Sequence, residues 1–253
     1  MRRVRGWFRA NNALVVSVAA RLLCRAKVAT IPSQFAQAIT DITPDTDTKT
    51  DLLNDQAFEM PLFPLGTVLF DGGQLPLRIF EPRYVDMISR CMKSDSGFGV
   101  LLIRSGSEIR GDRNDAGPEV FPTGTEARIE DFNPLSDGTL GIVARGGRKF
   151  SVIETRAQAD GLLIGQVRFM PEEPLIAVDE RFDGLIEILK ELIRHPMIEK
   201  MELEFDFTDA RSVGWRLAEL LPIEAEIKQS LLQMQLPRER LVELVRIVNK
   251  LKG

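Results

Sequence analysis

The sequence predicts an α+β protein, in which a β domain with one inserted helix is followed by a helical bundle. Three observations lead to this prediction. Between residues 61 and 170 glycines are dense and short apolar runs lie between them, which is the spacing of a compact β domain. Beyond Pro174 the apolar residues recur instead at helical spacing. Within the β part, Pro82 suits the first position of a helix.

Seven strands are expected in the β domain, at residues 67–70, 74–79, 98–103, 125–132, 139–144, 149–155 and 162–169. In the fourth of these, Ala127 and Ile129 alternate with charged residues, which predicts one dry face and one wet face. Asp137-Gly138 predicts a hairpin turn because glycine accepts a positive φ without steric cost, and Gly146-Gly147 predicts a second turn. The inserted helix carries its apolar residues at helical spacing: Tyr84, Val85, Ile88 and Met92.

Four amphipathic helices are expected after the β domain, at about residues 182–193, 209–221, 224–233 and from 237 onward. Thr208 or Asp209 is a candidate N-cap for the second helix, and Pro196 is expected to stop the first. Together the four helices make a C-terminal four-helix bundle. We therefore expect a β domain over residues 60–172 and a helical bundle over residues 173–253.

The first 59 residues differ in charge from the rest of the chain. Residues 1–40 hold seven basic and no acidic residues, whereas the body from Met60 onward holds 25 basic and 31 acidic residues. Residues 41–57 are a polar run typical of a linker. Three interpretations stay open for this extension: a disordered tail or a start assigned too early, a targeting leader, or an arm for a membrane surface or nucleic acid. Neither uncharged stretch within it reaches the roughly 20 apolar residues of a membrane span.

Composition and motifs exclude several classes of chemistry. Two cysteines, Cys24 and Cys91, are too few for a disulfide framework or a Cys-rich zinc module, and the single histidine removes most His-based metal sites. The formal net charge of −4 argues against a general nucleic-acid binder. No Gly-x-x-x-x-Gly-Lys-Ser/Thr phosphate loop and no Gly-x-Ser-x-Gly elbow occurs. We therefore expect no catalytic residue, no cofactor and no metal.

The remaining polar candidates have simple structural interpretations. His195 lies at the end of an expected helix just before Pro196, where an imidazole suits the helix dipole. Cys91 falls on the inserted helix and is expected to pack as a small hydrophobic residue. Solvated faces or a solvated loop are expected for the other charged candidates, which are Arg110, Asp112, Arg113, Glu172, Glu173, Glu202, Glu204, Asp206 and Asp209.

One strand-to-helix corner combines apolar, aromatic and charged residues. Glu81 and Arg83 flank Pro82, so Glu81 suits the helix start and Arg83 closes the corner by pairing. The alternative is that Arg83 and Tyr84 help to line a binding cleft. The candidate residues, for peptide binding or for holding the corner, are Phe63, Phe80, Glu81, Arg83 and Tyr84.

These residues resemble the Lon protease N-terminal (substrate-binding) domain family, whose fold is PUA-like. The resemblance covers about residues 60–251 and rests on the segments Pro61–Leu65, Leu75–Tyr84, Phe98–Ile103, Thr123–Ile129, Leu135–Leu140, Gly147–Phe150, Leu217–Pro222 and Lys228–Leu232. The run Phe80-Glu81-Pro82-Arg83-Tyr84 is quite specific to it. The family usually has proline where Asp71 stands, and often histidine where Arg78 stands. The resemblance implies that the β domain is a PUA-like β-barrel.

The resemblance also implies a function. In the family this domain is thought to help recognise unfolded or tagged polypeptides. Lon proteases continue into an ATPase module and a Ser–Lys protease domain, and the sequence contains neither, so we expect a stand-alone form that is not an enzyme. Its expected partners are polypeptide segments or a protein, and an apolar groove between the β domain and the bundle is one physical route to such binding.

Two other functions stay open. PUA-like folds also bind RNA, although the net charge of −6 on the body argues against nucleic acid. The basic patch for that function consists of Arg145, Arg148, Lys149 and Arg168. An unrecognised small-molecule enzyme requires His195 or Cys91 to meet carboxylates in a pocket. The expected compartment is the cytoplasm, with organelle targeting or export as the alternative if residues 1–30 act as a leader.

Overall fold

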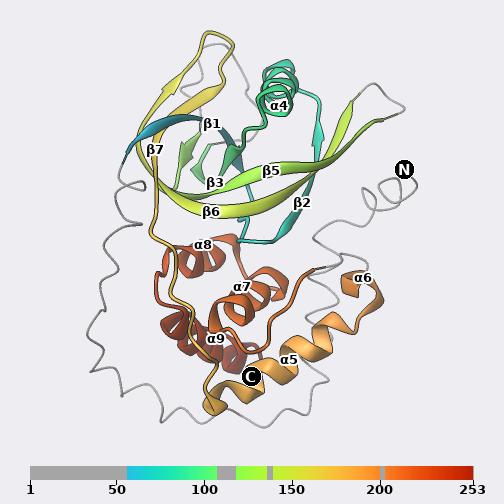
Figure 1. Ribbon diagram of the computed structural model, residues 1–253, viewed down its shortest axis with the longest axis vertical. Helices are drawn as coiled ribbons and strands as arrows, with labels where there is room; N and C mark the ends of the chain where they lie inside the picture. The colour runs from blue at the N-terminus through green and yellow to red at the C-terminus, as the bar shows by residue number, and fades with distance from the viewer. Residues whose placement is uncertain (1–55, 107–117, 136–138, 200–202, 253) are drawn as a thin grey trace. The chain divides into compact units, whose positions relative to one another are not determined.

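The computed structural model describes residues 56–106, 118–135, 139–199 and 203–252 (Figure 1). The described chain is of mixed α and β structure and divides into two compact units, and the boundary along the chain falls between Met170 and Pro171. The first unit is a β-sheet with one helix, and the second is helical. The predicted order of a β part followed by a helical part is therefore confirmed.

Seven strands and one α-helix make up the described part of the first unit: β1 (Phe58–Leu65), β2 (Gln74–Ile79), α4 (Pro82–Ser94), β3 (Phe98–Ser105), β4 (Glu119–Val120), β5 (Thr123–Pro134), β6 (Leu140–Ala157) and β7 (Leu163–Phe169). The hydrogen-bonded order is β1-β7-β6-β5-β3-β4, and β2 pairs with β6. β1 also pairs with β3, in parallel, whereas the other strand pairs are antiparallel. β1 thus has a strand on both of its edges.

Two separate apolar clusters pack against β1. Phe63 and Leu65 contribute to the larger cluster, which includes the buried side chains of α4, whereas Met60 and Leu62 contribute to the smaller one. Successive side chains of a strand point to opposite faces, so a strand buried on both faces is apolar along most of its length. This explains the sequence Phe-Glu-Met-Pro-Leu-Phe-Pro-Leu of β1.

Helix α4 begins as the sequence predicts and buries a slightly different stripe. Pro82 occupies the start of the helix after Glu81, and Asp95 ends it in the left-handed conformation with φ 49°. The buried residues are Tyr84, Met87, Ile88 and Cys91, and burial raises the pKa of the Cys91 thiol. Val85 and Met92, which the helical spacing grouped with this stripe, are exposed.

The glycine pair at 146–147 does not form the predicted turn. Instead, β6 continues through it, so the two strands expected at 139–144 and 149–155 are one. A Cβ atom at Gly146 would lie 2.1 Å from the carbonyl oxygen of Phe70, and the Gly146 amide donates to the Gly73 carbonyl at 2.9 Å. Glycine is needed here because a neighbouring backbone approaches closely. That neighbouring loop includes residues 67–70, where the sequence predicted a strand.

The second unit holds five α-helices among its described residues rather than the predicted four: α5 (Asp183–Ile193), α6 (Pro196–Glu199), α7 (Ala210–Leu220), α8 (Ala225–Gln233) and α9 (Pro237–Lys252), with a 3₁₀ turn at Glu180–Phe182. The four expected helices correspond to α5, α7, α8 and α9. Pro196 opens α6 instead of ending the helical stretch, because proline is tolerated in a first turn. Asp209 is the N-cap of α7, and its side chain accepts from the Arg211 amide at 3.0 Å. No helix of the described chain is long and apolar enough to cross a membrane.

Gly124 lies in a part of the sheet where neighbouring atoms leave no room for a side chain, which leads to a prediction on stability. A Cβ atom at Gly124 would lie 2.5 Å from the Val100 carbonyl oxygen and 2.7 Å from the Phe150 ring, whereas at Gly147 the nearest atom would be 3.6 Å away. We expect Gly124→Ala to lower the free energy of unfolding by about 1–3 kcal/mol, the usual cost of overpacking. Gly147→Ala, the matched control, should change it by less than about 0.5 kcal/mol. Urea unfolding measures the free energy of unfolding of both variants, and equal effects would contradict the close packing around Gly124.

Candidate functional site

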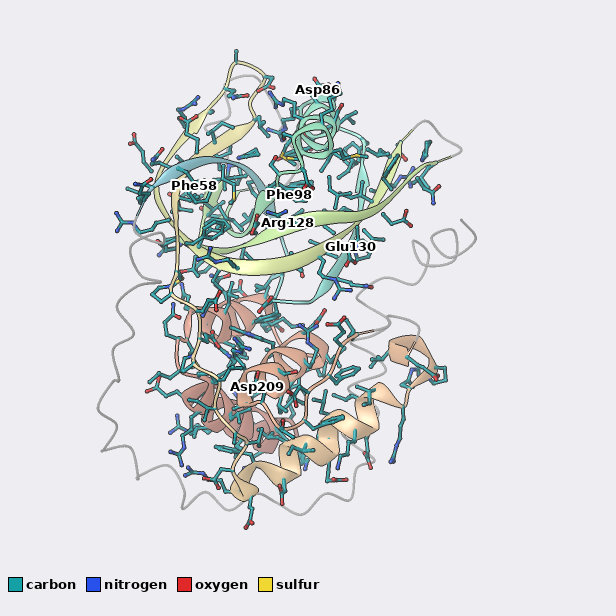
Figure 2. The ribbon with its side chains drawn as sticks, viewed as in Figure 1. Phe58, Asp86, Phe98, Arg128, Glu130 and Asp209 are labelled. Atoms are coloured by element: carbon teal, nitrogen blue, oxygen red, sulfur yellow. The ribbon has the colours of Figure 1, made fainter. Side chains whose placement is uncertain are left out.

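The corner singled out from the sequence is a stack of side chains. Phe63 from β1 and Tyr84 from α4 are stacked, with ring centroids 4.0 Å apart and an interplanar angle of 21°. The Arg83 guanidinium carbon lies 4.6 Å from the centroid of the Tyr84 ring. Phe98, which Figure 2 shows among the strands, lies 6.1 Å from Phe63 by ring centroid. Phe63 and Tyr84 are buried, so they hold the corner rather than offer a surface.

Arg83 joins three parts of the first unit. Its Nη2 lies 2.7 Å from Glu81 Oε2, and its Nη1 donates to the Gly161 carbonyl oxygen at 2.8 Å. Gly161 has φ +82° in the turn between β6 and β7, a conformation that glycine adopts without strain. Arg83 therefore ties the start of α4 to a turn 78 residues further along the chain. Four of the five predicted residues therefore contact one another or the Gly161 turn: Phe63, Glu81, Arg83 and Tyr84.

Phe80 is the exception, because 56% of it is exposed. It stands one residue before the N-cap Glu81, and Val85 is the fourth residue of the helix. These are the positions at which apolar side chains pack together as a hydrophobic staple. Val85 and Met92 are seven residues apart and share one face of α4, and both are exposed. We call Phe80, Val85 and Met92 the α4 ridge.

The other candidates from the sequence do not converge on a site. Cys91 lies in the apolar core. The His195 backbone links α5 to α6, since its amide donates to the Leu192 carbonyl and its own carbonyl accepts from the amides of Ile198 and Glu199. Arg110, Asp112, Arg113 and Glu202 lie outside the described residues. Within the described ranges no group of three or more His, Cys, Asp or Glu side chains is arranged to hold a metal ion.

The four basic residues considered for RNA binding are in different surroundings. Lys149 is buried, and Arg145 makes an ion pair with Glu130. The Arg148 guanidinium carbon lies 4.2 Å from the centre of the Phe169 ring, while Arg168 is exposed. A phosphate-binding patch needs several exposed basic groups side by side, so these residues do not favour that function.

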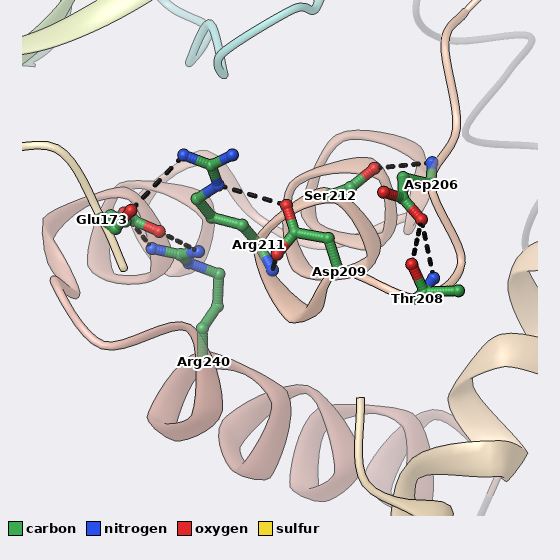
Figure 3. A network of polar contacts seen from close by, with 7 residues as sticks. All are labelled: Glu173, Asp206, Thr208, Asp209, Arg211, Ser212 and Arg240. Carbon is green, nitrogen blue, oxygen red and sulfur yellow. Dashed lines mark hydrogen bonds and ion pairs between the residues drawn. The ribbon is translucent and has the colours of Figure 1, made fainter. Parts of the chain in front are cut away.

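A buried polar network organises the second unit (Figure 3). Arg240 Nη1 and Nη2 donate to the two carboxylate oxygens of Glu173 at 2.8 and 2.5 Å, and both side chains are at most 3% exposed. The guanidinium also lies 3.2 Å from the centre of the Trp215 ring, and it donates to the carbonyl oxygens of Leu231 and Met234. Glu173 was expected on a solvated face, and that expectation is wrong because its partner is supplied by α9.

The start of α7 is fixed by acidic side chains of the same network. Asp209 makes an ion pair with Arg211 at 3.2 Å, and Arg211 Nη1 donates to the Glu173 carbonyl oxygen at 3.4 Å. Asp206 Oδ1 accepts from both the hydroxyl and the amide of Thr208, which lowers the pKa of Asp206. These hydrogen bonds end the loop and begin the helix, so Asp206 and Asp209 serve the fold rather than a site.

Lys228 on α8 is a half-buried cation that contacts the end of α7. Its Nζ donates to the Glu219 carbonyl oxygen, near the end of α7, at 2.7 Å. Burial lowers the pKa of Lys228 to about 8, and the Glu219 carboxylate opposes this shift. Glu219 also pairs with the buried Arg216 at 2.5 Å. This group of charges therefore joins α7 to α8.

The sheet unit and the helices after it define a known class of domain. A solved structure of a Lon N-terminal domain protein from Xanthomonas campestris is 34% identical, with a TM-score of 0.62, and the match covers 75% of this chain and 98% of that one. The N-terminal domain of a Mycobacterium avium complex Lon protease, at 16% identity and a TM-score of 0.52, shares the fold. The family model of the ATP-dependent protease La (LON) substrate-binding domain matches residues 59–250. The chain belongs to this family.

Several curated relatives match only in part. Cereblon from Xenopus tropicalis is 29% identical over 48% of this chain and 26% of its own length. A LON peptidase N-terminal domain and RING finger protein from Schizosaccharomyces pombe is 29% identical over 74% of this chain and 44% of its own length. The chain spans between 26 and 29% of the length of the three cereblons that it matches.

The Glu173–Arg240 pair generates a prediction on stability. Removing one partner leaves a buried charge, so Glu173→Leu or Arg240→Met should each cost about 3–5 kcal/mol of unfolding free energy. The double variant should cost clearly less than the sum of the two, since no unpaired charge is left. The exposed pair Glu243–Arg246 is the control, and its coupling should stay below about 1 kcal/mol. Equal coupling in the two double-mutant cycles would contradict the importance of burial.

Lys228 generates a prediction on pH. Its pKa is lowered in the folded chain, so between about pH 8 and pH 10 the unfolded chain binds more protons than the folded chain. The free energy of unfolding should therefore rise with pH over this range, relative to a Lys228→Met variant, by on the order of 1 kcal/mol. Urea unfolding of both proteins at pH 7.5 and pH 9.5 measures the difference. Parallel pH dependence in the two would contradict the shifted pKa.

Proposed function

We propose that this chain is a non-enzymatic binding module that holds apolar segments of polypeptides through the α4 ridge. The observation that carries the proposal is the exposure of Phe80 beside a corner whose other residues are buried and joined to one another. An aromatic ring held beside a rigid corner can bury apolar area in a complex at little cost in ordering. Family membership supports a role in recognising substrates, because the matching model describes a substrate-binding domain.

Within this proposal the five corner residues have two roles. Phe80 contacts the bound segment, and Val85 and Met92 extend the contact along α4. Phe63, Tyr84, Glu81 and Arg83 keep the helix start in place. The polar groups of the corner are engaged in the fold, since Arg83 pairs with Glu81 and donates to Gly161. This supports binding without chemical turnover.

Two finer features belong to the same proposal. We propose that the sheet unit has the PUA-like barrel arrangement, which the return of the strand pairing from β3 to β1 supports. The proposed compartment is the cytoplasm, where a free thiol such as Cys91 stays reduced.

A titration tests the binding function. A fluorescein-labelled protein kept unfolded by reduction and carboxymethylation is titrated with the chain, and fluorescence anisotropy should show saturable binding. Phe80→Ser should raise the dissociation constant about five- to tenfold, because burying the exposed part of the Phe80 side chain is worth about 1 kcal/mol. Ile153→Ser is the matched control, since Ile153 is 55% exposed but lies in β6.

The control separates this site from general stickiness. Ile153→Ser should leave the dissociation constant within twofold of the original. If Phe80→Ser and Ile153→Ser weakened the affinity equally, the α4 ridge would not be the binding site. If binding did not saturate, the proposed function would be rejected.

A further inference from the structure

The outward face of α4 carries a pattern that the peptide-binding proposal does not explain. Val85, Ser89 and Met92 follow one another along one line of the helix, and all three are exposed. Asp86, Arg90 and Lys93 lie beside this line, also exposed, and Figure 2 shows Asp86 on the side of the helix away from the strands. Within the described chain, neither the Asp86 carboxylate nor the Lys93 ammonium takes part in an ion pair.

These residues are placed symmetrically about Ser89. Val85 lies four residues before it and Met92 three residues after it, while Asp86 lies three before and Lys93 four after. In an antiparallel helix pair with a two-fold axis at Ser89, Val85 of one copy faces Met92 of the other. Asp86 of one copy then faces Lys93 of the other. This two-fold axis is perpendicular to both helices, so the apolar side of one helix faces the apolar side of the other. The charged sides likewise face each other, with opposite charges opposed.

We propose that α4 is a self-association surface, on which a second copy of this chain packs its own α4 in antiparallel orientation. The small side chain of Ser89 at the centre lets the two helices approach closely. A parallel pair is disfavoured, because its two-fold axis runs along the helices and brings the charged side of one copy, with Asp86 and Lys93, against the apolar side of the other. In the two-fold pair, Asp86 of each copy lies between Arg90 and Lys93 of the other, and this charge complementarity is why a second copy fits this face.

The contact is small, so the expected dimer is weak. Each copy contributes two exposed apolar helix residues and three charged ones, which is the scale of a transient interface. The proposal does not rest on peptide binding, but it uses residues of the same ridge. A bound polypeptide and a second copy should therefore exclude each other on α4.

Sedimentation of the full chain across about 5–300 µM tests the proposal. The wild type should show a reversible monomer–dimer equilibrium within this range. Asp86→Lys and Lys93→Asp, tested separately, each create like-charge contacts and should weaken dimerisation about tenfold or more. The two changes combined restore opposite charges, and dimerisation should return to within about threefold of the original.

Sedimentation of a control variant shows whether the effect is specific to α4. Glu154→Lys makes the same change in charge on the exposed part of β6 and should leave the dimer unchanged. Circular dichroism of each variant confirms that it is folded. A monomer at every concentration, or a double variant no better than the singles, would overturn the proposal. The peptide titration is read at chain concentrations below about 5 µM, under the range in which the dimer is expected, so failure of either proposal leaves the other testable.

Discussion

Arg83 connects the helix of the sheet unit to strands that are far away in the sequence. One guanidinium pairs with Glu81 before the helix, lies over the Tyr84 ring, and donates to the carbonyl of Gly161 between β6 and β7. The flat fork of arginine allows these contacts at once, which a lysine ammonium does not reproduce. Because the helix start is fixed in this way, Phe80 is presented on a rigid support. The proposed binding ridge depends on that support.

The second unit is organised by a comparable device placed deeper in its core. Arg240 comes from α9, its carboxylate partner Glu173 comes from the segment before the helices, and the ring beneath it comes from α7. Gly214 of α7 makes room for the arginine, since a Cβ atom there would lie 3.1 Å from its Cδ. In both units an arginine therefore replaces part of the apolar packing that would otherwise join distant segments.

Local patterns predicted most of the elements and the residues of the corner. The apolar spacing and the end signals of a helix are local in the sequence, and they predicted helices α5, α7, α8 and α9. The turn at 146–147 was wrong because Phe70 approaches Gly146 closely, and residues 67–70, predicted as a strand, belong to the loop that makes this approach. Glycine at a turn and glycine under a neighbouring backbone give the same signal in a sequence. The partners Gly161 and Glu173 were missed for a related reason, since they lie 78 and 67 residues from the arginines that they bind.

The surroundings of Cys91 and Trp215 allow the two units to be observed independently. The Cys91 thiol is enclosed in the core of the sheet unit, so a thiol reagent reaches it only when that core opens. The indole of Trp215 lies under the Arg240 guanidinium, so its emission changes when the helical unit loses its packing. With Cys24 and Trp7 replaced, labelling and fluorescence in one denaturation experiment would reveal whether the units unfold together or in sequence.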